Sequence, residues 1–317
     1  MSRSILSPEG IFPTPLSFHQ LSGNACAFTS AGLPNTGVVI GVKSVLVFSP
    51  QASPEAVAEI EKQIKRLTHV PVRYLVLSDL HSITRPEESA FPGAVVIASH
   101  ATDEAISERE AEEWRISVQR FPVLQGMDGS RGKRVIPEVI VDECLMLELG
   151  NQRVLVFHPG AGHTGGDTVL WVPDQKILFS GGLVVSEITP FCGDAYLHQW
   201  TLTLKVLAEF EPLILLPGSG QPVQGREASL EAIEYTRGYV SRLYCYVSES
   251  IQKGGGLTEA YHLVRDRMNA EYGTGFGYER FLPFNVSRAI DEASGVEQPQ
   301  PWTVEKEQAL WQSLGYL

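Results

Sequence analysis

Two loops in this sequence place a histidine directly after an apolar segment, and such loops can build a metal site. Asp79 and His81 follow the apolar residues 74–77, and His163 follows the apolar residues 154–157. Imidazole nitrogens and carboxylate oxygens are common protein ligands of zinc and iron. If both apolar segments are strands, their ends deliver the three side chains to one edge of the fold. The pattern therefore indicates a candidate metal site made of Asp79, His81 and His163.

The elements that must position these residues alternate between strands and helices. Apolar runs predict strands at 37–41, 45–48, 72–78, 94–98, 134–141, 143–149, 153–158, 167–172 and 176–180, and a buried strand after Pro212. The helical signals between them are a segment that opens at Ser53 with Val57, Ile60, Ile64 and Leu67 on one face, and segments at 102–118 and 198–209. Strands mixed with helices in two similar halves predict a layered α/β architecture.

The last quarter of the chain has a different, purely helical pattern. Helices are predicted at 226–252, 257–270, 285–295 and 303–315, with Thr258, Asn285 and Thr303 as N-caps. We therefore expect one domain over residues 1–225 and a helical extension over residues 226–317. This extension is expected either to cover the mouth of the site or to form an interface in a homo-oligomer.

Five landmarks occur in the same order as in the metallo-β-lactamase superfamily, which the chain resembles over residues 24 to 224. They are opening strands at 24–49, a first metal motif at 79–84, a Gly-x-Gly-His-Thr motif at 160–164, a Gly-Asp-Leu-like element at 181–183 and a Pro-Gly-His-Gly-like element at 217–220. The resemblance implies a four-layer αββα sandwich, in which two sheets pack face to face with helices outside. The motif Phe284-Asn285-Val286 also resembles the helical extension of quinoprotein-relay and sulfur-oxidation members.

The resemblance also implies which positions hold metal, and here the family pattern is damaged. The first-metal positions fall on Asp79, His81 and His163, with an open fourth position for water. The second-metal positions hold residues that are poor or impossible side-chain ligands, namely Ile83, Thr84, Gly182 and Ser219. We therefore expect at most one divalent metal ion, zinc or iron, and no second metal site.

The resemblance implies a further loss at the residue that orients the attacking water in the family. This position is Ile83, which cannot accept a proton. The loop after Gly182 carries Glu187, Cys192 and Asp194, and one of these could supply a replacement ligand or base. Asp167, by contrast, is expected together with Thr164 to fix the histidine loop rather than to take part in chemistry.

Three functions stay open at this point. In the first, the protein is a divergent mononuclear hydrolase whose metal polarises a carbonyl or phosphoryl oxygen of a small-molecule substrate. Alternatively, it is a catalytically inactive member that binds a small molecule or a protein partner in the old active-site cleft. In that case His81 and His163 only hold loops, and Asp79 pairs with an arginine such as Arg85. A third function, redox or oxygen chemistry at one iron ion, follows from the same three ligands.

Composition narrows the class of partner. The 317 residues are 43% hydrophobic and 20% charged, and the net charge is -12, so we expect neither nucleic acid nor an anionic membrane as a partner. No apolar run reaches the roughly 18 residues that a membrane helix needs. The 4 cysteines lie far apart. These features predict a cytoplasmic protein with free thiols.

Overall fold

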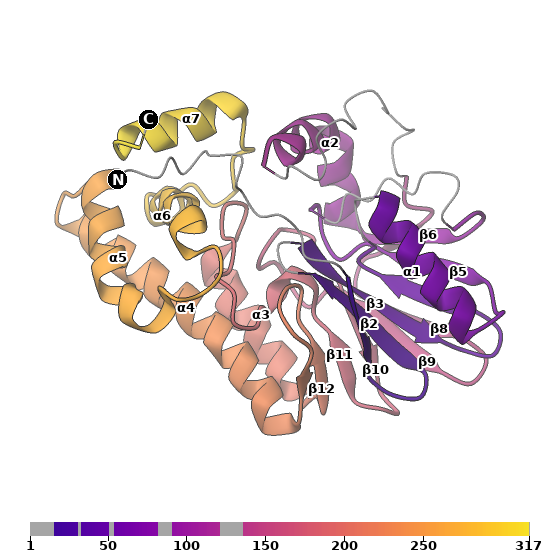
Figure 1. Cartoon of the computed structure of the whole chain (residues 1–317). Coiled ribbons are helices and arrows are strands. Elements are labelled where there is room, and N and C mark those ends of the chain that lie inside the picture. The colour runs from indigo at the N-terminus through magenta and orange to yellow at the C-terminus, as the bar shows by residue number, and fades with distance from the viewer. Residues whose placement is uncertain (1–15, 31–32, 51–53, 82–90, 121–135, 317) are drawn as a thin grey trace.

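The computed structural model describes residues 16–30, 33–50, 54–81, 91–120 and 136–316, which form two sheets packed face to face (Figure 1). The first sheet has seven strands in the order β1-β2-β3-β4-β5-β6-β7. Its strands are Ser17–Gln20, Ala25–Ser30, Leu33–Ile40, Val45–Phe48, Val72–Val76, Val95–Ser99 and Val139–Val141. Strands β1 to β4 are antiparallel neighbours, whereas β4 to β7 run parallel.

The second sheet has six strands in the order β13-β12-β11-β10-β9-β8. The strands β8 to β13 are Cys144–Glu148, Arg153–Phe157, Val169–Val172, Ile177–Phe179, Ile214–Leu216 and Val223–Gln224. All neighbours are antiparallel except β11 and β12, which run parallel and are connected through helix α3.

The helices lie outside the two sheets. Helices α1 to α7 span Pro54–Leu67, His100–Arg120, Leu197–Glu209, Arg226–Gln252, Leu257–Tyr272, Tyr278–Ala293 and Val304–Ser313. Figure 1 shows α1 on the side of the first sheet, and α4 to α7 gathered beyond α3 on the other side. Among the described residues, no helix is long and apolar enough to cross a membrane.

The core between the sheets is built from the inward-facing residues of both. Phe48 of β4 and Phe179 of β11 meet there with their ring centroids 6.0 Å apart. On the outer face of the first sheet, Val57, Ile60 and Ile64 of α1 are buried against the strands. These layers confirm the predicted αββα sandwich with its C-terminal helical region.

The helical region shares its apolar core with α3 and the second sheet. Trp200 and Leu204 of α3 belong to the same buried cluster as Val240 of α4, Val264 of α5 and Ala289 of α6. Burial of these side chains removes apolar surface from water on both sides of the contact and so joins the helices to the sandwich. The boundary between residues 225 and 226 stays a prediction.

Several element ends differ from the predictions. Helix α6 begins at Tyr278, after Gly277 in the left-handed region at φ 80°, and it contains Pro283. The predicted start at residue 285 is therefore wrong, and Asn285 lies inside the helix rather than at its N-cap. Thr258 is also not a cap, because α5 begins after Gly256, whose N–H donates to the Glu259 carboxylate at 3.0 Å.

Two more helix ends, the start of α7 and the end of α1, were also predicted. The N-cap prediction for Thr303 is confirmed, since its hydroxyl accepts a hydrogen bond from the Lys306 N–H at 3.1 Å. Leu67, predicted on the buried face of α1, is 43% exposed because the helix ends there.

Candidate metal centre

Asp79 lies three residues after the end of β5, and the local turn fixes its carboxylate. The His81 N–H donates to Oδ1 at 2.8 Å, which is the aspartate turn in which a side chain holds the backbone two residues on. The Ser78 hydroxyl donates to Oδ2 at 2.8 Å. Asp79 is 4% exposed, so its carboxylate lies inside the protein, where these bonds fix its orientation.

His163 lies in the loop between β9 and β10, and its side chain is 11% exposed. The ring packs edge-on against Trp200 of α3, with centroids 5.8 Å apart. Gly182 leaves the space that the ring occupies, because a Cβ at that position would lie 2.3 Å from His163 Nδ1. The His163 ring is therefore held between the Trp200 indole and the backbone at Gly182.

Asp167 follows in the same loop and is fully buried. Its carboxylate accepts hydrogen bonds from the Thr164 N–H at 3.0 Å and from the Thr164 hydroxyl at 3.0 Å. These bonds match the predicted role of both residues in fixing the loop. Asp167 Oδ1 also lies 3.6 Å from His163 Nδ1, so the same carboxylate faces the histidine.

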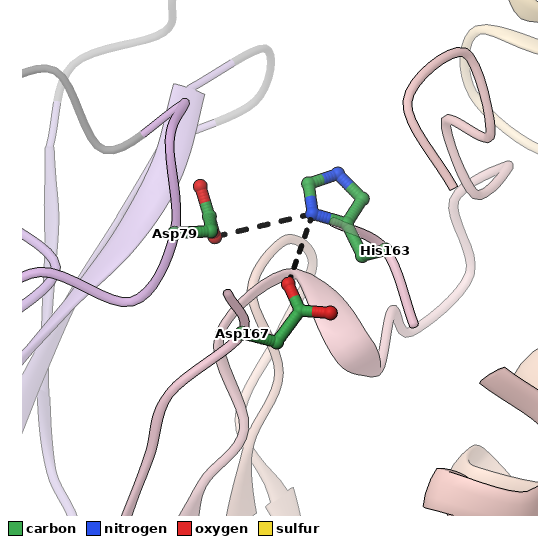
Figure 2. Close-up of side chains that lie close together, drawn as sticks. All are labelled: Asp79, His163 and Asp167. Carbon is green, nitrogen blue, oxygen red and sulfur yellow. Dashed lines mark ion pairs between the residues drawn. The ribbon is translucent and has the colours of Figure 1, made fainter. Parts of the chain in front are cut away.

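One histidine nitrogen and two carboxylates face one another in this region (Figure 2). His163 Nδ1 lies 3.9 Å from Asp79 Oδ2 and 3.6 Å from Asp167 Oδ1. One ligand atom from each of the three residues lies within 4.8 Å of the others. Within the described residues, Nδ1 is buried and completes no hydrogen bond. Two carboxylates and an imidazole fit a divalent cation, which would satisfy this nitrogen.

His81 lies beside this group. Its ring centroid is 5.1 Å from that of His163, so the two side chains converge as predicted from the two strand ends. His81 Nε2 is 3.4 Å from Asp194 Oδ2, and Nδ1 is 3.8 Å from Glu113 Oε2. The candidate ligand atoms within 4.8 Å of one another come from Asp79, His163 and Asp167. A ligand role for His81 therefore stays a prediction.

The buried charges shift the pKa values of three of these groups. For Asp79, burial acts to raise the pKa, but the neighbouring His163 and His81 outweigh it and lower the pKa. For Asp167, burial dominates and raises the pKa. For His81, burial acts to lower the pKa, but Asp194 with Glu113 and Asp79 raises it to about 9. The carboxylates thus create a field that favours positive charge at this place.

The loop residues predicted as replacements are placed very differently. Asp194 is buried and reaches His81. Cys192 is buried in the apolar cluster around α3, and Glu187 is exposed in the left-handed region at φ 58°. Of the three, Asp194 is therefore the residue that the described structure brings to the site.

The positions at which the resemblance predicts a lost second metal are only partly described. Ile83 and Thr84 lie outside the described residues. Gly182 lies against His163, and Ser219 is half-buried with its carbonyl accepting a hydrogen bond from the Ser186 N–H at 3.1 Å. Neither Gly182 nor Ser219 supplies a carboxylate or an imidazole.

Sequence reasoning missed two carboxylates of the site. Asp167 is four residues after His163, and this spacing within a tight loop was the available signal. Glu113 comes from α2, where it is one of several glutamates, so the sequence offered no signal that distinguishes it. Its burial against His81 is a result of how α2 lies on the first sheet.

Comparison with known proteins agrees with this geometry. Residues 90–219 match the model of the metallo-beta-lactamase superfamily. The chain is 36% identical over 80 residues to the metallo-beta-lactamase type 2 of Bacillus cereus, covering 24% of this chain and 31% of that protein. It is 25% identical over 223 residues to the metallo-beta-lactamase type 2 of Bacillus sp. (strain 170), covering 65% and 77%. The first of these matches thus spans less than a third of the relative's length.

Solved structures show the same fold. A metallo-beta-lactamase from Pontibacter korlensis matches with a TM-score of 0.55 and 21% identity, covering 69% of this chain and 99% of that one. The DIM-1 metallo-beta-lactamase matches with a TM-score of 0.55 and 19% identity, covering 73% and 99%. The chain thus has the fold of these metallo-beta-lactamase structures, and its segment 90–219 is similar to the metallo-beta-lactamase superfamily.

Proposed function

We propose that this protein is a divergent hydrolase that uses a single divalent metal ion, zinc or iron. Asp79, His163 and Asp167 hold the ion, and His81 lies next to it. The observation that carries the proposal is His163 Nδ1, which is buried between two buried carboxylates and completes no hydrogen bond among the described residues. A buried imidazole nitrogen without a partner is costly, and a cation relieves both this cost and the repulsion of the carboxylates.

The residues of the chain divide the work around such an ion. When bound, a divalent ion polarises a carbonyl or phosphoryl oxygen and lowers the pKa of a bound water. His81 is the acid–base group beside the ion, and Asp194 Oδ2, which lies 3.4 Å from Nε2, orients its ring. Without an ion, Asp194, Glu113 and Asp79 outweigh burial and raise the pKa of His81 to about 9, so its ring is protonated at neutral pH.

A single ion, rather than a pair, fits the residues at the former second site. Gly182 has no side chain, and Ser219 offers only a neutral hydroxyl. Ile83 and Thr84, the other two positions, add no carboxylate or imidazole. Two divalent ions repel each other without bridging anionic ligands, so the site supports one. The resemblance to quinoprotein-relay and sulfur-oxidation members remains a prediction.

The first test is metal content. Protein purified without chelator and then titrated with zinc is expected to bind about one ion per chain by elemental analysis. His163→Ala is expected to abolish binding. The matched control is His198→Gln, which removes an exposed histidine at the start of α3 and is expected to leave the stoichiometry unchanged. Zinc retained by His163→Ala would place the ion elsewhere, and two ions per chain would overturn the single-metal proposal.

The second test separates a hydrolase from an inactive binding protein. Metal-loaded protein is screened against ester, thioester, phosphodiester and lactam substrates, with His163→Ala as the control. Turnover that disappears in His163→Ala supports the hydrolase. Metal binding without turnover of any of these substrates, the esters included, would favour the alternative, in which the same place binds a small molecule or a protein partner.

A further inference from the structure

The loop from Pro190 to His198 carries Asp194, and side chains from the C-terminal helical region hold its backbone. Trp302 Nε1 donates to the Gly193 carbonyl at 3.1 Å. Side chains of α6 form hydrogen bonds with other backbone groups of the loop. The loop therefore obtains partners for its backbone polar groups from residues about a hundred positions further along the chain.

Asn285 of α6 binds the beginning of this loop. Its Oδ1 accepts a hydrogen bond from the Cys192 N–H at 2.7 Å, and its Nδ2 donates to the Pro190 carbonyl at 2.8 Å. Nδ2 also donates to the Tyr239 hydroxyl of α4 at 2.8 Å. Asn285 is completely buried, so these bonds are made away from water, where loss of a partner is expensive.

Arg288 and Glu292, one and two turns further along α6, bind the end of the loop. Arg288 is 1% exposed, and its Nε donates to the Ala195 carbonyl at 2.7 Å. Its other nitrogens bind the Glu292 carboxylate at 3.1 Å and two carbonyls beyond α6. The Glu292 carboxylate accepts from the Leu197 and His198 N–H groups at 2.9 Å each, which caps the start of α3.

Asp194 lies between the two sets of bonds. Its side chain is buried and faces His81 at 3.4 Å from Nε2. Because the backbone on both sides of Asp194 is fixed by α6, the position of its carboxylate depends on that helix. We propose that Asn285 and Arg288 are positioning residues of the metal centre, which act through Asp194 to orient His81. The C-terminal helical region is thus a working part of the site.

This inference rests on the proposed function for the identity of the site, but its test does not need metal or turnover. The metal-free protein is labelled with carbon-13 in its histidine rings, and the His81 resonance is assigned by its loss in His81→Gln. At one fixed pH, Asp194→Asn is expected to shift this resonance. Asn285→Ala is expected to shift it in the native background and to cause no further shift in the Asp194→Asn background, because it acts through the same carboxylate.

The controls separate positioning from general loss of packing. Tyr239→Phe removes the third hydrogen bond of Asn285 but leaves both bonds to the loop, so it is expected to lower stability without shifting the His81 resonance. Trp302→Phe keeps an aromatic ring and loses one bond to the loop. It is expected to produce a smaller shift than Asn285→Ala, and it provides the test if Asn285→Ala fails to fold.

The outcomes are distinguishable from failure of the proposed function. A folded Asn285→Ala protein with an unchanged His81 resonance would overturn the positioning role, whether or not the protein binds zinc. Equal shifts in Asn285→Ala and Tyr239→Phe would also overturn it. Shifts in Asn285→Ala and Trp302→Phe but not in Tyr239→Phe, in a protein that binds no zinc, would support the positioning role and reject the metal.

Discussion

Gly182 and His163 are in contact at a distance that leaves no room for any side chain at position 182. A Cβ there would lie 2.3 Å from Nδ1 and 2.7 Å from Cγ and Cε1 of His163. The backbone cannot retreat easily, because the Gly181 carbonyl is itself tightly packed against Gly218. Position 182 thus accommodates the histidine ring only because it has no side chain.

Gly182→Ala is expected to displace the His163 ring and weaken metal binding. Displacement of one ligand is comparable to loss of a supporting contact, which typically costs about 10- to 100-fold in metal affinity. Zinc affinity is measured by competition with a chromophoric chelator. Gly23→Ala is the matched control, because a Cβ at Gly23 meets nothing within 4 Å. Unchanged affinity in Gly182→Ala would mean that His163 is not a ligand.

Asp167→Asn is expected to abolish zinc binding but to leave the metal-free protein no less stable. The amide can still accept from the Thr164 N–H and can donate to the Thr164 hydroxyl and towards His163 Nδ1. It also removes one of two buried carboxylates that repel each other without a cation. Thermal unfolding with and without zinc checks both statements. Zinc-dependent stabilisation in Asp167→Asn would exclude Asp167 as a ligand.

The cysteines predict a specific response to alkaline pH. Burial raises the pKa of the Cys26 thiol from 9.0 to about 12. Burial, with a smaller contribution from Glu292, also raises the pKa of the Cys192 thiol well above its usual value. The unfolded chain therefore releases the Cys26 proton first, so the free energy of unfolding falls as pH rises from 9.0 towards 12. Cys26→Ala should show a shallower fall in urea denaturation over this range. A parallel decline in both proteins would contradict the assignment.

The same burial predicts the pattern of thiol reactivity. Cys144 and Cys245 are exposed, whereas Cys26 and Cys192 are buried. A chromogenic disulfide reagent is expected to modify two thiols in the native protein and all four after denaturation, with peptide mapping to identify them. Rapid modification of Cys192 in the native protein would show that its loop opens readily.

Hydrolysis of β-lactams by the metal-loaded protein is expected to be very weak, as are the thioester and phosphodiester activities. The predicted correspondence with the family motif puts Ile83 in the place of the water-orienting aspartate, and loss of general-base assistance typically lowers the rate by about 10²- to 10⁴-fold. The proposed single-ion site also lacks the stabilisation of developing charge that a second ion supplies. Rates with a chromogenic cephalosporin are compared with those of His163→Ala. A large rate that vanishes in that variant would show that another residue, such as Asp194, replaces the base.

The sequence contained enough information for the sandwich and for the meeting of His81 with His163. Each histidine lies in a loop after an apolar strand, β5 of the first sheet and β9 of the second, so both loops were expected at the same edge of the sandwich. The apolar face of α1 could be read in the same way, except at Leu67, where the helix ends and the side chain is 43% exposed.

The rest of the site depends on contacts between distant segments, for which a single sequence has no local signal. Glu113 reaches His81 because α2 packs on the first sheet, and no spacing within the helix distinguishes it from its neighbours. Asn285 is of a residue type that is common at helix N-caps, but it is buried within α6, where its partners are loop groups 93 and 95 residues away. The favourable partners of a buried amide are visible only when both segments are in place.

The bonds between α6 and the Asp194 loop also set an order for synthesis of the protein. Chains emerge from the ribosome from the N-terminus at about 5–20 residues per second. The loop groups at Cys192 and Ala195 are made well before Asn285 and Arg288, from which they are each separated by 93 residues. Both sheets are complete by Gln224, so a nascent chain contains every strand before it contains the side chains that hold this loop. Translation that stops between these points yields a chain with both sheets and with His81 and His163 but without the side chains that hold the Asp194 loop.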